Sequence, residues 1–218
     1  MAFGYPVFLE LGGRKAVVIG EQAVRDGKVE GLVAAGAAQV IVVAERPARV
    51  LDDLEAEHSP YVDVQRRAWR PDDLEGALVV VASSDDDAER AAIAREARAR
   101  GALVNVMDDV ANCDWAAPAI VRRGELAIAI STGGRSPALA KKMRIELEER
   151  FGAEWAGVLG VLRSVREETL PHLPDLRVRA ARWSEALDLD EAETLLREGR
   201  GAELHDRLVS RLLLESEA

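Results

Sequence analysis

Cysteine is almost absent from the chain, which contains only Cys113 among its 218 residues. A single cysteine excludes a disulfide within the chain and any zinc cluster built on cysteine ligands. Aromatic residues are also scarce, at 4% of the sequence. Because 48% of the residues are nevertheless hydrophobic, the interior must be filled mainly by alanine, valine and leucine.

An excess of basic charge is also missing. The formal net charge is −10, and the many arginines alternate with glutamate and aspartate, as is typical of solvated helix faces. Binding to nucleic acid or to an acidic membrane surface needs clustered lysine and arginine. The charge therefore argues against both kinds of partner.

Long apolar runs are lacking too. No segment approaches the roughly 20 residues that span a bilayer, and the first residues do not follow the basic, apolar and small-residue order of a secretion signal. We therefore expect a cytoplasmic protein. A chain of 218 residues has room for one large domain or two small ones.

Short apolar runs alternate with longer helical patterns over the first half of the chain. Strands are predicted at Lys15–Ile19, Gln39–Ala44, Tyr61–Val64, Ala77–Ala82 and Leu103–Met107. Helices are predicted at Ala23–Ala35, Arg49–Glu57 and Asp86–Arg100. Strand–helix–strand units of this kind favour right-handed crossovers and a parallel sheet with helices on both faces. The predicted fold class is α/β, with a Rossmann-like parallel sheet.

The pattern changes after Asp109. Gly124-Glu125 is typical of a two-residue hairpin turn, flanked by strands at Ala119–Arg123 and Leu126–Ser131. Ser136-Pro137 then predicts a helix to about Arg150, with serine as N-cap and proline at the first helical position. Only helical periodicity follows. We therefore predict three regions: a nucleotide-type domain at 1–113, a small linking segment at 114–150, and an α-helical C-terminal domain at 151–218.

The turn after the first strand is a candidate nucleotide site. A dinucleotide-binding fold usually carries G-x-G-x-x-G there, because glycines let the backbone approach a pyrophosphate at a helix N-terminus. This chain keeps only the first glycine of that pattern. Its candidate residues are Gly20, Glu21, Gln22, Ala23 and Val24. Glu45 follows the second strand, where an acid can bind both ribose hydroxyls and favour NAD over NADP; the alternative is an ordinary loop acid.

Two later strands end in chemically useful residues. Leu103–Met107 delivers Asp108 and Asp109, and Leu126–Ile130 delivers the loop Ser131–Pro137. A carboxylate beyond the carboxyl end of a parallel strand lies where such folds place their ligands, so Asp108 is a candidate general base. The alternative is that either aspartate is a loop acid or a helix cap.

The small-residue loop can bind anions. Thr132, Gly133, Gly134 and Ser136 offer hydroxyls and backbone N–H groups at the start of a helix, whose dipole favours negative charge. Ser136 taken alone is better explained as an N-cap, and the two roles are compatible. The three histidines are scattered and have neither an i, i+4 metal-binding partner nor an acid cluster, so we expect no permanently bound metal.

These motifs together resemble one family, the siroheme synthases of the precorrin-2 dehydrogenase and sirohydrochlorin ferrochelatase type. The resemblance covers roughly residues 5–150. It consists of P-V-F-L-E-L-G-G-R at Pro6–Arg14, K-V at Lys28-Val29, V-N-V-M-D at Val104–Asp108, C-D-W-A-A-P-A at Cys113–Ala119, and I-S-T-G-G-R-S-P-A-L-A at Ile130–Ala140.

The resemblance implies a homodimer of three parts, in which the segment 114–150 serves dimerisation and tetrapyrrole binding. It implies that precorrin-2 is oxidised to sirohydrochlorin with NAD as hydride acceptor, and that ferrous iron is then inserted as a substrate to give siroheme. It makes Asp108 the catalytic residue of both reactions. It also places Ser83 and Ser84 beside the cofactor, and Asn105 with Thr132, Gly133, Gly134 and Ser136 beside the substrate.

The chain departs from the family at the first turn, where the usual pattern is G-G-G-x-V-A-x-R-K. Glu21 and Gln22 replace two glycines, and Gly27 replaces the arginine before Lys28. The alternative is therefore a single-function member, either a chelatase or a tetrapyrrole-binding protein without NAD-dependent activity. A non-enzymatic NAD or metabolite sensor on the same scaffold is a third possibility.

Overall fold

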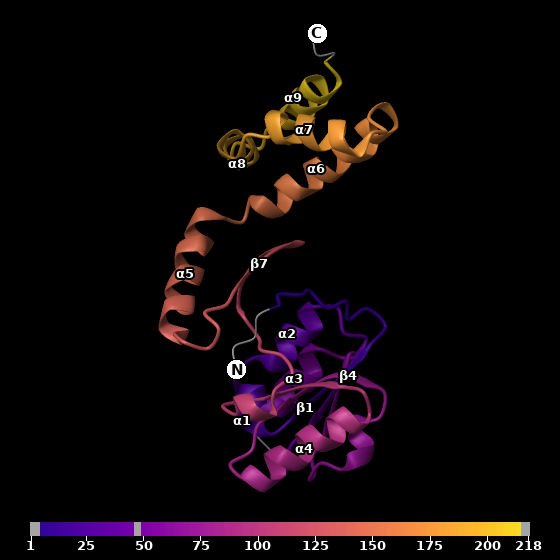
Figure 1. Cartoon of the computed structure of the whole chain (residues 1–218), viewed down its shortest axis with the longest axis vertical. Helices are drawn as coiled ribbons and strands as arrows, with labels where there is room; N and C mark the ends of the chain where they lie inside the picture. Colours follow the sequence, from indigo (N-terminus) through magenta and orange to yellow (C-terminus); the bar gives the residue numbers. More distant parts are fainter. Residues whose placement is uncertain (1–4, 46–48, 215–218) are drawn as a thin grey trace. The chain divides into compact units, whose positions relative to one another are not determined.

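The computed structural model describes residues 5–45 and 49–214. It divides into two compact units, one up to Ala117 and one from Pro118 onward (Figure 1). We call them the sheet unit and the helical unit. The separation of a distinct segment at 114–150 stays a prediction.

The sheet unit is built on five parallel strands in the order β3-β2-β1-β4-β5. The strands are β1 (Lys15–Ile19), β2 (Gln39–Val43), β3 (Val62–Gln65), β4 (Ala77–Ala82) and β5 (Leu103–Val106). The helices between them are α1 (Glu21–Arg25), α2 (Lys28–Ala34), α3 (Arg49–Glu57) and α4 (Asp87–Ala99), with short 3-10 turns η1 (Pro71–Leu74) and η2 (Val110–Asn112). The parallel α/β sheet predicted from the sequence is confirmed.

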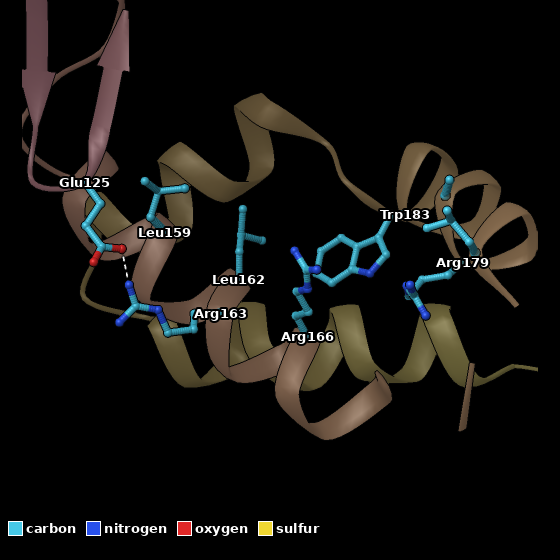
Figure 2. Close-up of a pocket in the computed structure, with 9 residues that line it drawn as sticks. Glu125, Leu159, Leu162, Arg163, Arg166, Arg179 and Trp183 are labelled. Carbon is cyan, nitrogen blue, oxygen red and sulfur yellow. Dashed lines mark hydrogen bonds and ion pairs between the residues drawn. The ribbon is translucent and has the colours of Figure 1, made fainter. Parts of the chain in front are cut away.

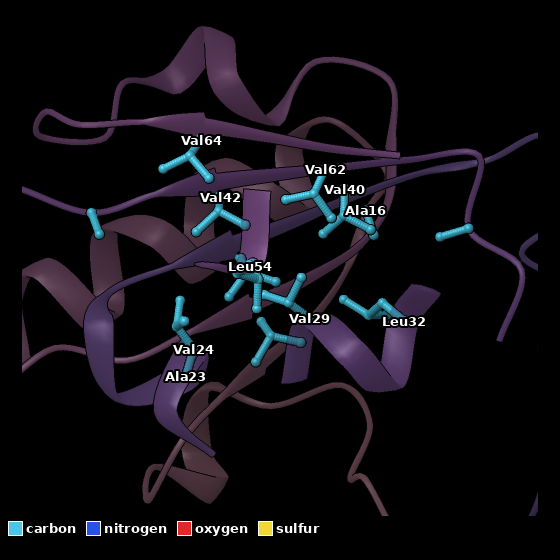
Figure 3. Packing of buried hydrophobic residues seen from close by; sticks show 14 of the residues in the cluster. Ala16, Ala23, Val24, Val29, Leu32, Val40, Val42, Leu54, Val62 and Val64 are labelled. Carbon is cyan, nitrogen blue, oxygen red and sulfur yellow. The ribbon is translucent and has the colours of Figure 1, made fainter. Parts of the chain in front are cut away.

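Both faces of this sheet are covered. Alternate residues of β1 point to opposite sides, so Ala16 and Val18 belong to one buried cluster and Val17 and Ile19 to another. Figure 3 shows the first cluster, in which side chains of β2 and β3 pack against those of the first three helices. The second cluster includes Ile93, Ala94 and Ala97 of α4. Strands buried on both faces explain the nearly continuous Val/Ile runs.

The predicted helix Ala23–Ala35 is two helices in the structure. α1 begins earlier, at Glu21, and α2 begins at Lys28. Gly27 between them has a φ of 68°, in the left-handed region that interrupts a right-handed helix and that glycine adopts without steric cost. The buried positions Val24 and Val29 lie on either side of the break.

The helical unit begins with the predicted hairpin. β6 (Ala119–Arg123) and β7 (Leu126–Ile130) pair antiparallel, with Arg123 opposite Leu126. The helices that follow are α5 (Pro137–Arg150), α6 (Trp155–Thr169), α7 (Leu176–Ala186), α8 (Leu189–Arg197) and α9 (Gly201–Leu213), with η3 (Leu170–His172) before α7.

The core of the helical unit lies among its last helices. Val158 and Val165 of α6 and Leu204, Leu208 and Leu212 of α9 are fully buried there. By contrast, α5 buries none of its residues. None of the helices within residues 5–45 and 49–214 is both long enough and apolar enough to cross a membrane.

Candidate functional site

The parallel arrangement brings most of the predicted cofactor residues to one edge of the sheet. Because β2, β1, β4 and β5 are parallel neighbours, the residues that follow them leave the sheet at the same, carboxyl edge. Gly20 follows β1, Ser83 follows β4, Asp108 comes two residues after β5, and Glu45, which is exposed, comes two residues after β2.

Gly20 occupies a position that no other residue fits. Its φ is 91° and its ψ is 149°, a combination available essentially to glycine alone. A Cβ atom placed on Gly20 would lie 2.1 Å from the backbone oxygen of Ser83. The Gly20 N–H also donates to the Val43 oxygen at 2.9 Å. This glycine therefore lets the turn pass closely between β2 and the end of β4.

Ser83 fixes the start of α1 from the neighbouring strand. Its hydroxyl oxygen accepts a hydrogen bond from the Ala23 N–H at 3.0 Å, and the hydroxyl donates to the Ile19 oxygen at 3.3 Å. Gly20, the N-cap of α1, has no side chain for this purpose. Ser83 therefore supplies the missing cap. In this arrangement its hydroxyl is engaged with the protein itself.

The two polar residues that replace glycines in this turn are directed along their own helix. The Glu21 carboxylate pairs with Arg25 at 3.2 Å, and the Gln22 amide donates to Asp26 at 2.9 Å. The following two predicted cofactor residues, Ala23 and Val24, are buried in the core. Any contact that these two residues make with a cofactor must therefore use their backbone atoms.

Ser84 belongs to a second set of contacts at this edge. Its hydroxyl donates to Glu89 and accepts from the Asp86 N–H. Ser84 is not the N-cap of α4, since Asp86 holds that position and accepts from the Ala88 N–H at 2.8 Å. Asp86 directly precedes the first residue of α4, as an N-cap does, whereas Ser84 lies two positions earlier.

Asp108 is the most unusual residue of the sheet unit. It lies in a turn closed by the Asp109 N–H, which donates to the Val106 oxygen at 3.2 Å. Its φ is 59°, and it is the one non-glycine residue with a positive φ within the described ranges 5–45 and 49–214. This region costs an L-residue roughly 1–2 kcal/mol, and its side chain is exposed. Unfavourable backbone geometry of this kind concentrates at functional positions.

Asp109 has a different role from its neighbour. Its carboxylate accepts from the Asn112 side-chain amide at 2.7 Å and from the Asn112 N–H at 3.3 Å, and Arg90 approaches it at 3.4 Å. These donors, the Asn112 amide foremost, hold the pKa of Asp109 below its ordinary value. Asp109 caps the turn η2. For this aspartate, the alternative of a helix cap is therefore the correct one.

Arg90 joins the loops that follow β4 and β5. It donates to the Ser84 backbone oxygen at 2.7 Å, pairs with Asp87, and reaches Asp109. Sequence reasoning did not single it out. The available signal was its place in the first turns of the helix after β4, from which a long side chain can reach both strand ends.

The Cys-Asp-Trp motif lies along the free edge of β5. The Asp114 carboxylate accepts from the Val104 N–H at 3.0 Å, and the Asp114 N–H donates to the Val104 oxygen at 2.7 Å. The Cys113 thiol contacts the backbone of Val106 at 3.1 Å, and burial raises its pKa. The motif therefore covers an exposed strand edge and anchors the loop that carries Asp108.

Asn105 is part of the same edge covering. Its side-chain amide donates to the Trp115 oxygen at 2.8 Å. This contact gives the residue a structural role, and its assignment to substrate binding stays a prediction.

The small-residue loop of the helical unit is held by its own hydrogen bonds. The Thr132 hydroxyl oxygen accepts from the Ser136 N–H, and the hydroxyl donates to the Ser136 oxygen, both at 3.2 Å. Ser136 accepts from the Leu139 N–H at 3.2 Å, which confirms it as the N-cap of α5. Gly133 and Gly134 both have positive φ angles. These hydrogen bonds within the loop give it a defined conformation.

Metal-binding side chains do not gather in the described part of the chain. No group of three or more His, Cys, Asp or Glu residues there has the geometry to hold a metal ion.

Comparison with known proteins places these features in a family. Residues 7–119 match the family model described as putative NAD(P)-binding. Residues 123–150 match the model described as sirohaem biosynthesis protein central. The two matched regions contain the Gly20 turn with Asp108, and the loop with Ser136, respectively.

Curated relatives extend the similarity over nearly the whole chain. Siroheme synthase of Methylococcus capsulatus is 31% identical over 97% of this chain and 43% of that protein. The siroheme synthases of Azotobacter vinelandii and Pseudomonas aeruginosa are 32% and 33% identical, over 88% and 95% of this chain and 40% and 44% of those proteins. The chain therefore spans about two fifths of the length of these relatives.

A solved structure has the same fold. The protein described as SirC, precorrin-2 dehydrogenase, superposes with a TM-score of 0.64 at 24% identity, covering 96% of this chain and 98% of that one. With the two family models and the curated relatives, the predicted resemblance is confirmed: the chain belongs to the putative NAD(P)-binding family, continues into the central region of sirohaem biosynthesis proteins, and is similar over most of its length to siroheme synthases.

Proposed function

We propose that this chain oxidises precorrin-2 to sirohydrochlorin with NAD, using Asp108 as general base. One observation carries the proposal: an exposed carboxylate is held in a left-handed conformation at the sheet edge where the Gly20 turn opens. The siroheme synthase relatives support the substrate class. The fold shared with a protein described as a precorrin-2 dehydrogenase is consistent with it.

The carboxyl edge of the sheet fits a dinucleotide. Gly20 brings bare backbone to the edge, and a side chain there would collide with Ser83. The carboxylate of Glu21 is bound to Arg25, which reduces its repulsion of a phosphate at the turn. Gly20, Glu21 and Gln22 would hold the pyrophosphate through backbone groups, and Glu45 would bind the ribose hydroxyls.

The remaining predicted cofactor residues support this edge. Ala23 and Val24 would present backbone atoms only, because their side chains are buried. Ser83 would keep α1 in place through its bond to the Ala23 N–H. Ser84 would line the nicotinamide side.

The oxidation removes a hydride and a proton from the substrate. NAD, when bound, supplies the hydride acceptor. The proton needs a base within hydrogen-bond reach of the macrocycle, and Asp108 suits this because its side chain is exposed. Asp109 does not, since Asn112 and Arg90 already occupy its oxygens. We therefore assign the proton transfer to Asp108.

The same carboxylate would serve the insertion of ferrous iron. Sirohydrochlorin loses pyrrole N–H protons when the metal enters the ring, and a base over the ring accepts them. Iron is here a substrate held by the macrocycle. In the helical unit, the loop of Thr132, Gly133, Gly134 and Ser136 would bind the peripheral carboxylates at the N-terminus of α5.

The working form would be a homodimer. The helix α5 buries no residue, and Leu139 and Met143, which lie one turn apart on the same face, are 49% and 40% exposed. The adjoining hairpin has only two strands, an arrangement of marginal stability in water without further packing. A second copy covering this surface would remove its apolar side chains from water. Leu139→Glu combined with Met143→Glu should then yield a monomer in light scattering, whereas an unchanged mass would refute this interface.

Turnover distinguishes the proposal from its alternatives. The full chain is incubated with precorrin-2 and NAD, the absorbance of sirohydrochlorin and NADH is followed, and ferrous iron is then added. NADH and sirohydrochlorin should form together, and siroheme should follow. Tetrapyrrole binding without NADH formation would instead support the single-function alternative, which the Glu21-Gln22 turn favours. Tight NAD binding without turnover would support a sensor.

A further inference from the structure

A pocket of about 490 Å³ opens in the helical unit, and none of the residues assigned above lines it. Figure 2 shows the side chains that line it. The helix α6 contributes Leu159, Leu162, Arg163 and Arg166, the helix α7 contributes Leu176, Arg179, Ala180 and Trp183, and Glu125 of the hairpin turn completes the lining. The volume falls within the range typical of small-molecule sites.

The two helices line the pocket in the same way. The lining residues of α6 are spaced by three, one and three positions, and so are those of α7. Residues at this spacing lie on one face of a helix. Each helix therefore turns a continuous face of apolar and cationic side chains toward the hollow.

The charge of the pocket is opposite to that of the chain. Three arginines line it against one glutamate, whereas the whole protein carries a formal charge of −10. Glu125 is paired with Arg163 across the pocket rim (Figure 2). Arg179 donates to the Leu173 backbone oxygen. Arg166 forms no ion pair within residues 5–45 and 49–214.

The floor of the pocket is apolar and includes an indole. Leu159, Leu162 and Trp183 are half-buried, and Leu176 is 68% exposed. An exposed leucine beside an indole offers favourable burial to a ligand with an apolar body. Inorganic phosphate would use the arginines but leave this floor in water. A ligand that uses both parts has a flat apolar body and a carboxylate.

We propose that this pocket binds a small amphipathic organic carboxylate. The apolar body lies on Leu162 and Trp183, and the carboxylate is bound by Arg166 and Arg179, whose guanidinium groups suit planar anions. The ordinary alternative is that the arginines merely lay their aliphatic stems over apolar neighbours while their charges remain in water. That alternative predicts no selectivity for a charged ligand.

Calorimetric titration of the full chain tests this. The probe is 2-naphthoate, and the neutral control is 2-naphthylmethanol, which has the same ring system. We expect naphthoate to bind at least tenfold more tightly than the alcohol, because a hydrogen bond to a charged group contributes about 1.5–3 kcal/mol. Added salt should weaken only the naphthoate. Equal affinities, or no binding of either, would overturn the proposal.

Matched variants locate the bound molecule. The double variant Arg166→Gln with Arg179→Gln should weaken naphthoate binding at least tenfold. Arg177→Gln removes an exposed arginine of α7 that does not line the pocket. It should change the affinity for naphthoate less than twofold. In amide and indole NMR spectra, naphthoate should shift the Trp183 indole signal, identified with Trp183→Phe. Equal effects of both arginine changes would contradict the assignment.

A second copy of the chain is the other occupant that the experiment can detect. If the double variant lowers the molecular mass in light scattering and naphthoate does not bind the parent protein, another protomer fills the pocket and the small-molecule proposal fails. The turnover assay with precorrin-2 uses neither arginine in its assigned steps. If the parent protein fails to bind naphthoate but still turns over precorrin-2, the result would therefore count against this pocket alone.

Discussion

Replacing Asp108 by glycine should separate catalysis from stability. Relief of the left-handed conformation at φ 59° would stabilise the fold by roughly 1–2 kcal/mol. The added freedom of glycine in the unfolded chain would cost about 0.4–1 kcal/mol of that gain. The net expectation is an unchanged or slightly higher free energy of unfolding, up to about 1.5 kcal/mol, because Asp108 is exposed and supports no core contact.

The same change should abolish the chemistry. Removing a positioned general base costs typically 10²- to 10⁴-fold in rate, so NADH formation by Asp108→Gly should fall by at least a hundredfold. Asp108→Asn is the matched control for shape, since asparagine tolerates the left-handed region while lacking the basic carboxylate. It should be equally inactive and as stable as the parent.

Two assays on each variant decide the matter: urea unfolding followed by circular dichroism, and precorrin-2 turnover with NAD. A variant that is stable and active within tenfold of the parent would refute the catalytic role. A variant that loses several kcal/mol of stability would show that Asp108 is retained for folding instead.

Three further changes test the surroundings of this residue. Gly20→Ala places a Cβ 2.1 Å from the Ser83 oxygen, so it should lower the urea midpoint strongly and abolish NAD binding in calorimetry; a stable variant with normal affinity would count against the described turn. If Arg90 positions the loop that carries Asp108, Arg90→Gln should lower kcat more than KM and flatten the dependence of kcat on pH. A change in stability alone would mean that Arg90 has a purely structural role. Asp109→Asn should lower the free energy of unfolding at pH 7, because the folded state holds the pKa of Asp109 below its ordinary value. This difference in stability between variant and parent should shrink as the pH falls from about 4 toward the folded-state pKa, since the aspartate is then protonated in both states. A pH-independent difference in urea midpoints would contradict this.

The strands were predictable because their signal is local. Runs such as Ala77–Ala82 are buried on both faces, so uninterrupted apolar sequence marks their length directly. The start of α5 was predictable for the same reason, because Ser136 is the N-cap and Pro137 is the first helical residue. The break between α1 and α2 was not, since Val24 and Val29 continue a helical pattern across the glycine that interrupts it.

The arrangement of the site depends on contacts between distant residues, which a single sequence does not reveal. The family resemblance placed Ser83 beside the cofactor, but it did not reveal that the Ser83 hydroxyl bonds Ala23, which lies 60 positions earlier. The conformation of Asp108 arises where the chain turns back and lays Asp114 along β5. The Cys-Asp-Trp motif indicated the family, and only the structure assigns it the covering of a strand edge.

The most direct test is a crystal structure of the chain with sirohydrochlorin bound. The account predicts the Asp108 carboxylate within hydrogen-bond distance of the macrocycle, and the loop from Thr132 to Ser136, from the same or a partner subunit, against the peripheral carboxylates. A macrocycle bound with Asp108 pointing away from it, and with that loop distant in every subunit, would contradict the account.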